Sequence, residues 1–209
     1  MPILGRSKGE CVDQFRNVLS KLLVQVLHKT RTVRAIATGD KFLIGILDEQ
    51  GFAAPVELHR VHGAPSLFLQ IWQTVAITDD VGGRGKRAFR LQTLEYNYHV
   101  SADPTAEPLL RWEYVKNPKN AARYCRHHLQ GSLALSDQSG HIDFKKMHVP
   151  TAYMLLEDVL RFVIDDLGHK PPCGEKWHQV LEESRQQFFE ELSSRPQSYS
   201  PAPRGRARD

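Results

Sequence analysis

The chain has 209 residues, of which 41% are hydrophobic and 25% are charged, so it can bury one sizeable core as a globular protein. Polar residues interrupt its longest apolar stretch, residues 18–27, and no segment resembles a membrane span or a signal peptide. Three widely spaced cysteines, Cys11, Cys125 and Cys173, argue against a disulfide framework and fit a reducing compartment. We therefore expect a cytoplasmic protein with no membrane partner.

The formal net charge of +4 is distributed unevenly along the chain. Residues 194–209 contain four Arg and one Asp, a balance of +3, which leaves +1 for residues 1–193. Residues 84–128 hold nine Lys or Arg against four Asp or Glu, net +5, whereas residues 151–193 hold four against nine, net −5. This separation of charge could steer an anionic ligand, or the two regions could simply attract each other.

The first predicted element is an amphipathic helix over residues 10–29, because its apolar positions recur every three or four residues. His28 and Lys29 would lie in its last turn, where cations suit the negative end of the helix dipole. The next part of the chain is harder to interpret. Its apolar run at residues 42–47 fits a strand or a helix, and the alternation at residues 56–62 favours a strand.

A strand with a bulge near Gln73 is predicted over residues 66–78, where β-branched and aromatic residues are frequent. A turn-rich connection follows over residues 79–86. Its Gly-Gly-Arg-Gly-Lys segment resembles a phosphate-binding loop, but that motif requires Ser or Thr after the Lys and then a helix. Because Arg87 and a strand follow instead, we reject a phosphate-binding loop here.

Three consecutive strands organise the centre of the chain, where apolar and polar residues alternate with a period of two. They are predicted over residues 88–100, 109–115 and 127–135. A proline-containing loop joins the first two strands, and a cationic loop over residues 117–126 joins the last two. A turn at residues 136–140 then leads to residues 141–148, which form a short strand or are irregular.

Two helices and a tail are predicted at the C-terminus. Thr151 is a suitable N-cap for a helix that Gly168 ends, and a last helix covers residues 174–193. Residues 194–209 are rich in Arg, Pro and Ser, which predicts a disordered tail. Strands followed by helices indicate an α+β fold in one domain, residues 1–193, with an N-terminal helix, an antiparallel sheet of about five strands and two C-terminal helices.

Arg111 and Glu113 are the first candidate site residues, because they share one strand face, together with His99 of the preceding strand. His127 and His128 are adjacent and point to opposite faces, so only one of them can join this face. Arginine could hold a phosphate while histidine transfers protons and the carboxylate orients it or acts as a base. Alternatively, Arg111 and Glu113 form an ordinary cross-strand ion pair and the histidines are solvated or bonded to backbone.

His148 is a further candidate, because it precedes the predicted helix N-terminus, where backbone N–H groups attract anions. The alternative is a histidine held by its own loop backbone. Cys125, His127 and His128 lack the paired spacing of zinc ligands, so we expect no metal ion and no other cofactor. Cys125 could also act as a nucleophile among its cations, although placement on a basic loop explains it more simply.

Aromatic residues interleaved with cations suggest a surface on which the bases of single-stranded RNA could stack. The residues concerned are Tyr96, Tyr98, Tyr114 and Tyr124. The alternative is that the aromatic residues of the sheet face the core, which is the better explanation for Tyr96 and Tyr98.

The order of these motifs resembles the TumE-like family of bacterial toxin–antitoxin toxins over residues 88–167. The matching parts are Leu110-Arg111-Trp112-Glu113-Tyr114, then Arg126-His127-His128, and then the helix predicted from Thr151 to Leu167. The chain departs from the family pattern at Glu113, which stands at an Asp position, and in having an adjacent rather than a spaced His pair.

The resemblance implies a small toxin-like protein that is made beside an antitoxin and cleaves RNA without a metal ion. The catalytic candidates are then Arg111, Glu113, His127, His128 and His148. Two other functions remain open. One is a non-catalytic interaction scaffold whose acidic helices or basic tail bind a partner protein, and the other is a metal-dependent hydrolase.

Overall fold

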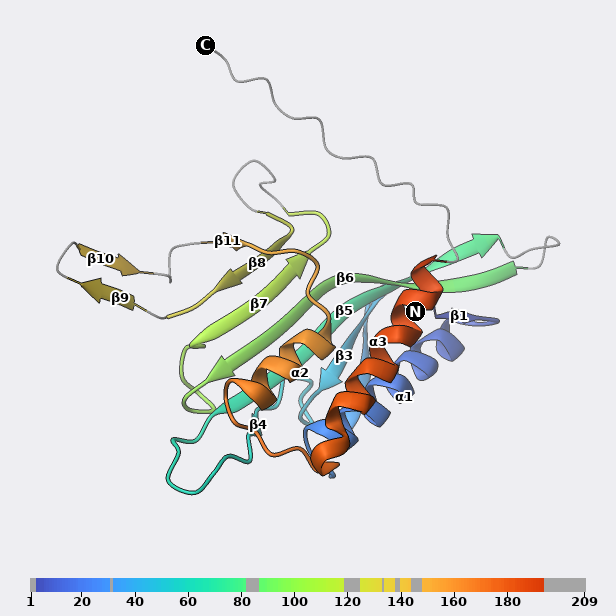
Figure 1. The fold of residues 1–209 in the computed structure, drawn as a ribbon. Coiled ribbons are helices and arrows are strands. Elements are labelled where there is room, and N and C mark those ends of the chain that lie inside the picture. The colour runs from blue at the N-terminus through green and yellow to red at the C-terminus, as the bar shows by residue number, and fades with distance from the viewer. Residues whose placement is uncertain are drawn as a thin grey trace, which may run out of the picture.

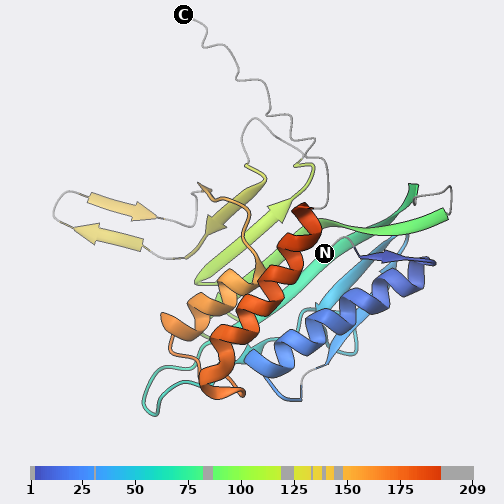
Figure 2. The ribbon, with the colours of Figure 1, turned by 45° about the vertical axis from the view of Figure 1, so that its right-hand side comes forward.

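The computed structural model describes residues 3–30, 32–81, 87–118, 125–132, 134–137, 140–143 and 148–193. Three α-helices pack on one face of a large antiparallel sheet, so the predicted α+β class is confirmed (Figure 1). The helices are α1 (Lys8–Val26), α2 (Leu156–Asp165) and α3 (Trp177–Ser193), and a 3-10 turn, η3 (Gly174–Lys176), precedes α3. The second view shows α1 and α3 lying side by side over the sheet (Figure 2).

The described part of the main sheet has nine strands, more than the five or so predicted. Its path runs β11 (Val149–Pro150), β8 (His127–Gln130), β7 (Leu110–Val115), β6 (Arg87–Ser101), β5 (Phe68–Val81), β3 (Lys41–Ile46) and β2 (Val33–Thr38). Two short strands flank it, since β1 (Leu4–Gly5) pairs with β6 and β4 (Val56–Glu57) pairs with β5. Most neighbours in the path are also consecutive in the chain, which is what short antiparallel connections produce.

Helix α1 begins two residues earlier and ends three residues earlier than predicted. Ser7 caps it, because its side chain accepts a hydrogen bond from the backbone N–H of Glu10 (3.1 Å). At the other end, the N–H groups of Leu27 (2.9 Å) and His28 (3.0 Å) both bond the carbonyl of Leu23, and the second bond spans five residues, one more than the helical bond, as is common where a helix ends. The expectation that His28 and Lys29 lie in the last turn is therefore wrong.

The ambiguous segment at residues 42–47 is a strand, β3, because β2 and β5 pair with it on either side. Gly39, with φ at 64°, makes the tight turn of the β2–β3 hairpin. The strand predicted over residues 56–62 is wrong beyond Glu57, because the next backbone bond, from Leu58 N–H to Leu67 O (2.8 Å), closes a loop.

The two longest strands, β5 and β6, pair along almost their whole length. Their register shifts between Thr74 and Val75, which confirms the bulge expected near Gln73. The turn-rich connection predicted over residues 79–86 is wrong at its start, because Asp79 pairs with Phe89 of β6 and β5 continues to Val81. The Gly-Gly-Arg-Gly-Lys segment, residues 82–86, lies outside the described residues.

The strand predicted over residues 127–135 is divided into two. β8 ends at Gln130. The next residue, Gly131, passes so close to Leu109 that a Cβ would lie 2.2 Å from its carbonyl oxygen, so only glycine fits at this position. The chain then forms a separate hairpin of β9 (Ala134–Asp137) and β10 (Gly140–Asp143), which stands off the main sheet (Figure 1). The turn predicted at residues 136–140 is thus partly strand.

Helix α2 begins at Leu156 rather than after Thr151. The N–H of Thr151 bonds the carbonyl of His127 (3.1 Å), so this part of the chain continues beside β8 in an extended form. The helix is capped at Leu155, whose N–H donates to the Asp158 carboxylate (3.1 Å). Gly168 reverses the chain after the helix with φ at 74°, and the predicted tail, residues 194–209, lies outside the described residues.

Three histidines from distant parts of the chain stack on one another. His28 follows α1, His59 lies in the loop after β4, and His169 lies between α2 and α3. The ring centroids of His28 and His59 are 5.6 Å apart, and those of His59 and His169 are 6.1 Å apart. His169 is 1% exposed, and its Nε2–H donates to the carbonyl of Val26 (3.1 Å), whereas its Nδ1 is buried without a hydrogen-bond partner among the described residues. The ring is therefore neutral, and burial lowers the pKa of His169 below its ordinary value.

We expect this arrangement to weaken the fold in mild acid. Because the unfolded chain binds a proton at His169 more readily than the native chain, the free energy of unfolding falls as the pH drops below about 6.5, by at most about 1.4 kcal/mol per pH unit. The variant His169→Gln keeps a donor for Val26 and does not titrate, so its stability should change less between pH 7 and about pH 5. Urea unfolding at each pH measures this, and equal slopes for the two proteins would contradict it.

Candidate functional site

The alternation of side chains divides the sheet into two chemically different faces. Tyr96, Tyr98 and Trp112 point to the helix side and are buried, and Trp112 contacts Phe162 of α2 with ring centroids 5.4 Å apart. His99 lies in phase with the opposite face, on which Arg111 is its partner in the β6–β7 register. None of the three described helices covers the opposite face, which we call the helix-free face (Figures 1 and 2).

The adjacent histidines of β8 separate onto these two faces, as expected of neighbouring strand residues. His128 pairs in register with Glu113 and lies on the helix-free face, 6% exposed. His127 lies on the helix side, where its ring stacks on Tyr114 with centroids 4.5 Å apart. The structure therefore groups Arg111, Glu113 and His128, and it places His127 elsewhere.

Glu113 is the centre of the group that we call the Glu113 cluster: His99, Arg111, Glu113, His128, Gln130 and His148. Its Oε2 lies 3.0 Å from Nε2 of His128, and its Oε1 lies 3.4 Å from Nε2 of His99 and 3.7 Å from a guanidinium nitrogen of Arg111. Burial alone would raise the pKa of the Glu113 carboxyl, but the rings of His128 and His99 and the charge of Arg111 outweigh it and hold that pKa well below its usual range. Glu113 is therefore an anion among donors.

His128 is held at both of its ring nitrogens. Nε2 faces the Glu113 carboxylate, and Nδ1 lies 3.2 Å from the backbone carbonyl of Cys125. Both partners are acceptors, so the ring satisfies both contacts only when each nitrogen carries a proton. These two contacts leave His128 no ring nitrogen for a bound molecule.

Within the cluster, Gln130 connects Arg111 to His148. Its Oε1 accepts a hydrogen bond from Arg111, and its Nε2 lies 2.8 Å from Nδ1 and 2.9 Å from Nε2 of His148. Because the amide nitrogen donates, His148 must accept with an unprotonated nitrogen, which is the neutral ring. Gln130 was missed as a site residue, although it lies two positions after His128 and hence in phase with it.

His148 is not beside a helix N-terminus, and that expectation is wrong, because α2 begins eight residues later at Leu156. It lies instead before β11, with its ring 4.9 Å from that of His128. Partial burial first, and then the charge of His128, lower the pKa of His148; the Glu113 carboxylate opposes them, and Arg111 adds a smaller lowering effect. His148 is therefore a neutral base beside two cations.

The members of the cluster differ in how far they reach solvent. The side chains of His128, His99 and Glu113 are 7%, 13% and 18% exposed, whereas that of Arg111 is 32% exposed. Trp72 packs its ring edge against His99, with centroids 4.6 Å apart, and borders the cluster on the β5 side. Arg111 is thus the cation best placed to meet a molecule from outside.

The tyrosines proposed as an RNA-stacking surface form an aromatic row on the helix side. Tyr96 stacks on Tyr98 and on Tyr114, with centroids 4.8 Å and 5.4 Å apart. Tyr96 and Tyr98 are each 2% exposed, so the structure supports their alternative role as core residues. Tyr124 lies outside the described residues, as do Lys119 and Arg123 of the cationic loop.

The fold and the cluster define an α+β protein with a histidine-rich polar group on the sheet face away from its helices. No protein-family model, curated protein or solved structure matches this chain. In the described part of the chain, no three His, Cys, Asp or Glu side chains are arranged to hold a metal ion. None of the described helices combines the length and apolar character that a bilayer crossing requires.

Proposed function

We propose that the protein cleaves RNA without a metal ion, as a toxin-like protein of the cytoplasm, and that the Glu113 cluster is its active site. The observation that supports this most is that Arg111, Glu113, His128 and His148, from strands β7 and β8 and the segment before β11, meet on one sheet face. Cations for a phosphate and a neutral imidazole for proton transfer are what cleavage of a phosphodiester by a neighbouring hydroxyl requires.

In this proposal the residues have separate roles. Arg111, the most exposed cation, binds the phosphate and stabilises its developing negative charge. The 2′-hydroxyl replaces the amide of Gln130 at the acceptor nitrogen of His148, which takes its proton as that oxygen attacks phosphorus, and the departing 5′-oxygen takes a proton from water. His128 cannot itself take the proton, because both of its ring nitrogens are already engaged. His128 and Glu113 instead position Arg111 and His148.

The experiment compares the cleavage of single-stranded RNA by the wild type, His128→Ala, His148→Ala and His127→Ala, all in a chelator of divalent metal ions. His148→Ala is expected to lower the rate by about 10²- to 10⁴-fold, since it removes the proton acceptor. His128→Ala should also lower it, through lost positioning. His127→Ala is the matched control, because it removes the adjacent histidine on the opposite face and should keep most of the activity.

The pH dependence of the rate gives a second readout of the same assay. Because the pKa of His148 is lowered, the wild-type rate should be constant around neutral pH and fall only as the pH drops below about 6.5. Equal losses in His127→Ala and His128→Ala would contradict the proposed site. Activity that the chelator abolishes would favour the metal-dependent hydrolase, and no cleavage by any of the proteins would favour the interaction scaffold.

An antitoxin partner belongs to the same proposal. To inhibit RNA cleavage, the antitoxin would have to cover the helix-free face near Arg111. Purified partner would then protect the RNA from cleavage, and it should bind Arg111→Ala more weakly than the wild type.

A further inference from the structure

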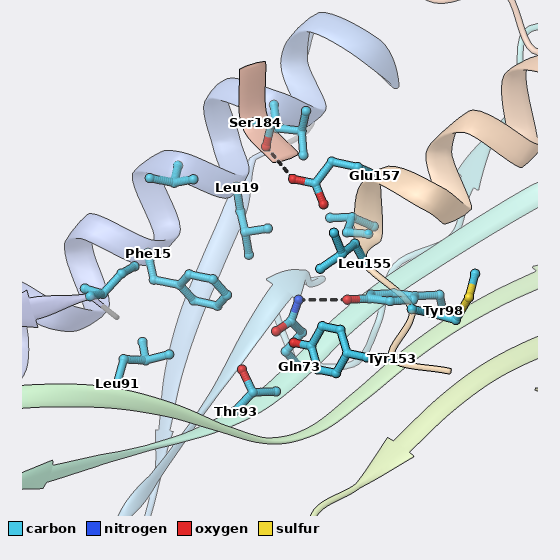
Figure 3. A pocket seen from close by; sticks show the side chains of 15 residues that line it. Phe15, Leu19, Gln73, Leu91, Thr93, Tyr98, Tyr153, Leu155, Glu157 and Ser184 are labelled. Atoms are coloured by element: carbon cyan, nitrogen blue, oxygen red, sulfur yellow. Dashed lines mark hydrogen bonds between the residues drawn. The ribbon is translucent and has the colours of Figure 1, made fainter. Parts of the chain in front are cut away.

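A pocket lies on the helix side of the sheet, between α1, strands β5 and β6, and the segment before α2 (Figure 3). Its volume is about 120 Å³, well above the roughly 10–15 Å³ that a single water needs. Phe15, Leu19, Leu91 and Leu155 form its apolar walls. Protein interiors are close-packed and hold few voids of this size. An apolar cavity of roughly 150 Å³ can bind benzene, so the pocket is of the order of size that a single-ring molecule needs.

One wall of the pocket carries the largely buried side chain of Gln73, whose amide oxygen is not used by a described protein donor. Gln73 is 7% exposed, and its Nε2 donates to the hydroxyl of Tyr98 (3.0 Å). Among the described residues its Oε1 has no hydrogen-bond partner, and Gln73 lines the pocket together with the hydroxyl-bearing residues Thr93 and Tyr153 (Figure 3). Gln73 thus offers the pocket an acceptor that no described protein group uses, and a bound molecule with a donor group would be favoured at this point.

The lining also limits the charge of a ligand. None of the described residues that line the pocket is Lys, Arg or His. The one acidic residue among them, Glu157, accepts a hydrogen bond from Ser184 of α3 at the far side (Figure 3). An anion would therefore be desolvated without a cation to pair with, and near a carboxylate.

We propose that this pocket binds a small neutral molecule with an apolar, ring-sized body and one hydroxyl or N–H group. The body fills the space between Phe15, Leu19 and Leu91, and the hydroxyl or N–H donates to Oε1 of Gln73, with Thr93 beside it. The site lies across the sheet from the Glu113 cluster, and nothing in this proposal depends on RNA cleavage.

Four probes of similar size test the chemistry, with binding to the full chain followed by titration calorimetry and by ligand-observed NMR. p-Cresol and anisole are isomers, of which only p-cresol donates a hydrogen bond, toluene has no polar group, and benzoate is an anion. We expect p-cresol to bind about 5- to 10-fold more tightly than anisole or toluene, because only it satisfies Gln73, and benzoate to bind least. No saturable binding of p-cresol, or tighter binding of benzoate, would overturn the proposal.

Three variants locate the binding. Leu19→Trp should fill the pocket and abolish p-cresol binding, and Thr93→Val should weaken it severalfold without a change in side-chain size. Thr74→Val is the matched control, because Thr74 follows Gln73 in β5 but does not line the pocket, and it should bind p-cresol as the wild type does. If circular dichroism shows that Leu19→Trp does not fold, the binding of p-cresol to Thr93→Val tests the location instead. Unchanged binding to Thr93→Val, or loss of binding in Thr74→Val, would place the ligand elsewhere.

Discussion

Glu113→Ala is expected to lower the free energy of unfolding by about 3 kcal/mol at neutral pH, a large part of the stability of a typical domain. The substitution leaves His128 and Arg111 close together on the sheet without the anion that pairs them. Removing one partner of a buried ion pair costs about 3–5 kcal/mol, and the lower end applies because the Glu113 side chain is 18% exposed. Urea unfolding followed by circular dichroism measures the difference.

The same residue should control part of the acid sensitivity. Because the native pKa of Glu113 is depressed, its contribution to stability is present above the ordinary glutamate pKa, about 4.3, and is lost as the pH falls through the native value. Glu113→Gln keeps the shape of the side chain but cannot titrate, so its stability should fall less between about pH 5 and pH 3. Glu49→Ala, which removes an exposed glutamate, is the control and should follow the wild type. If the free energy of unfolding of Glu113→Gln fell with pH as steeply as that of the wild type, the ion pair of Glu113 with His128 and Arg111 would contribute little to stability.

The second large effect is expected at Gly45 in β3. A Cβ at this position would lie 2.3 Å from the carbonyl oxygen of Ile71 and 2.8 Å from Cα of Trp72, both on the paired strand β5. Backbone atoms cannot move aside as a flexible side chain does, so Gly45→Ala should force β3 and β5 apart and cost about 3 kcal/mol. The same strand pair supports Trp72, which contacts His99 of the Glu113 cluster.

Gly9 provides the matched control for this substitution. It lies in α1, and the nearest atom to a Cβ there is 4.0 Å away, on Ser7. Gly9→Ala should therefore stabilise the protein by about 0.5–1 kcal/mol, because alanine favours the helix. Thermal unfolding should move the midpoints of the two variants in opposite directions, and equal midpoints for Gly45→Ala and the wild type would show that the two strands adapt.

The sequence by itself determined the features that depend on neighbouring residues in the chain. The period of two placed Arg111 and Glu113 on one strand face and allowed only one of His127 and His128 to join them, because successive strand residues point to opposite sides. The spacing of apolar residues likewise predicted three helices and the α+β class, which the structure confirms. These are local consequences of backbone geometry.

Only the tertiary structure decided which histidine joins the site and what surrounds it. The register of β7 with β8 brings His128, not His127, opposite Glu113, and this register depends on a connecting loop whose geometry the sequence does not reveal. The start of α2 was likewise set by a distant contact, since pairing of Thr151 with His127 keeps the chain extended past a good N-cap residue. Pairing between strands is a long-range interaction that no local pattern encodes. For this reason the sequence alone did not predict that Arg111 contacts Gln130 and that Gln130 contacts His148.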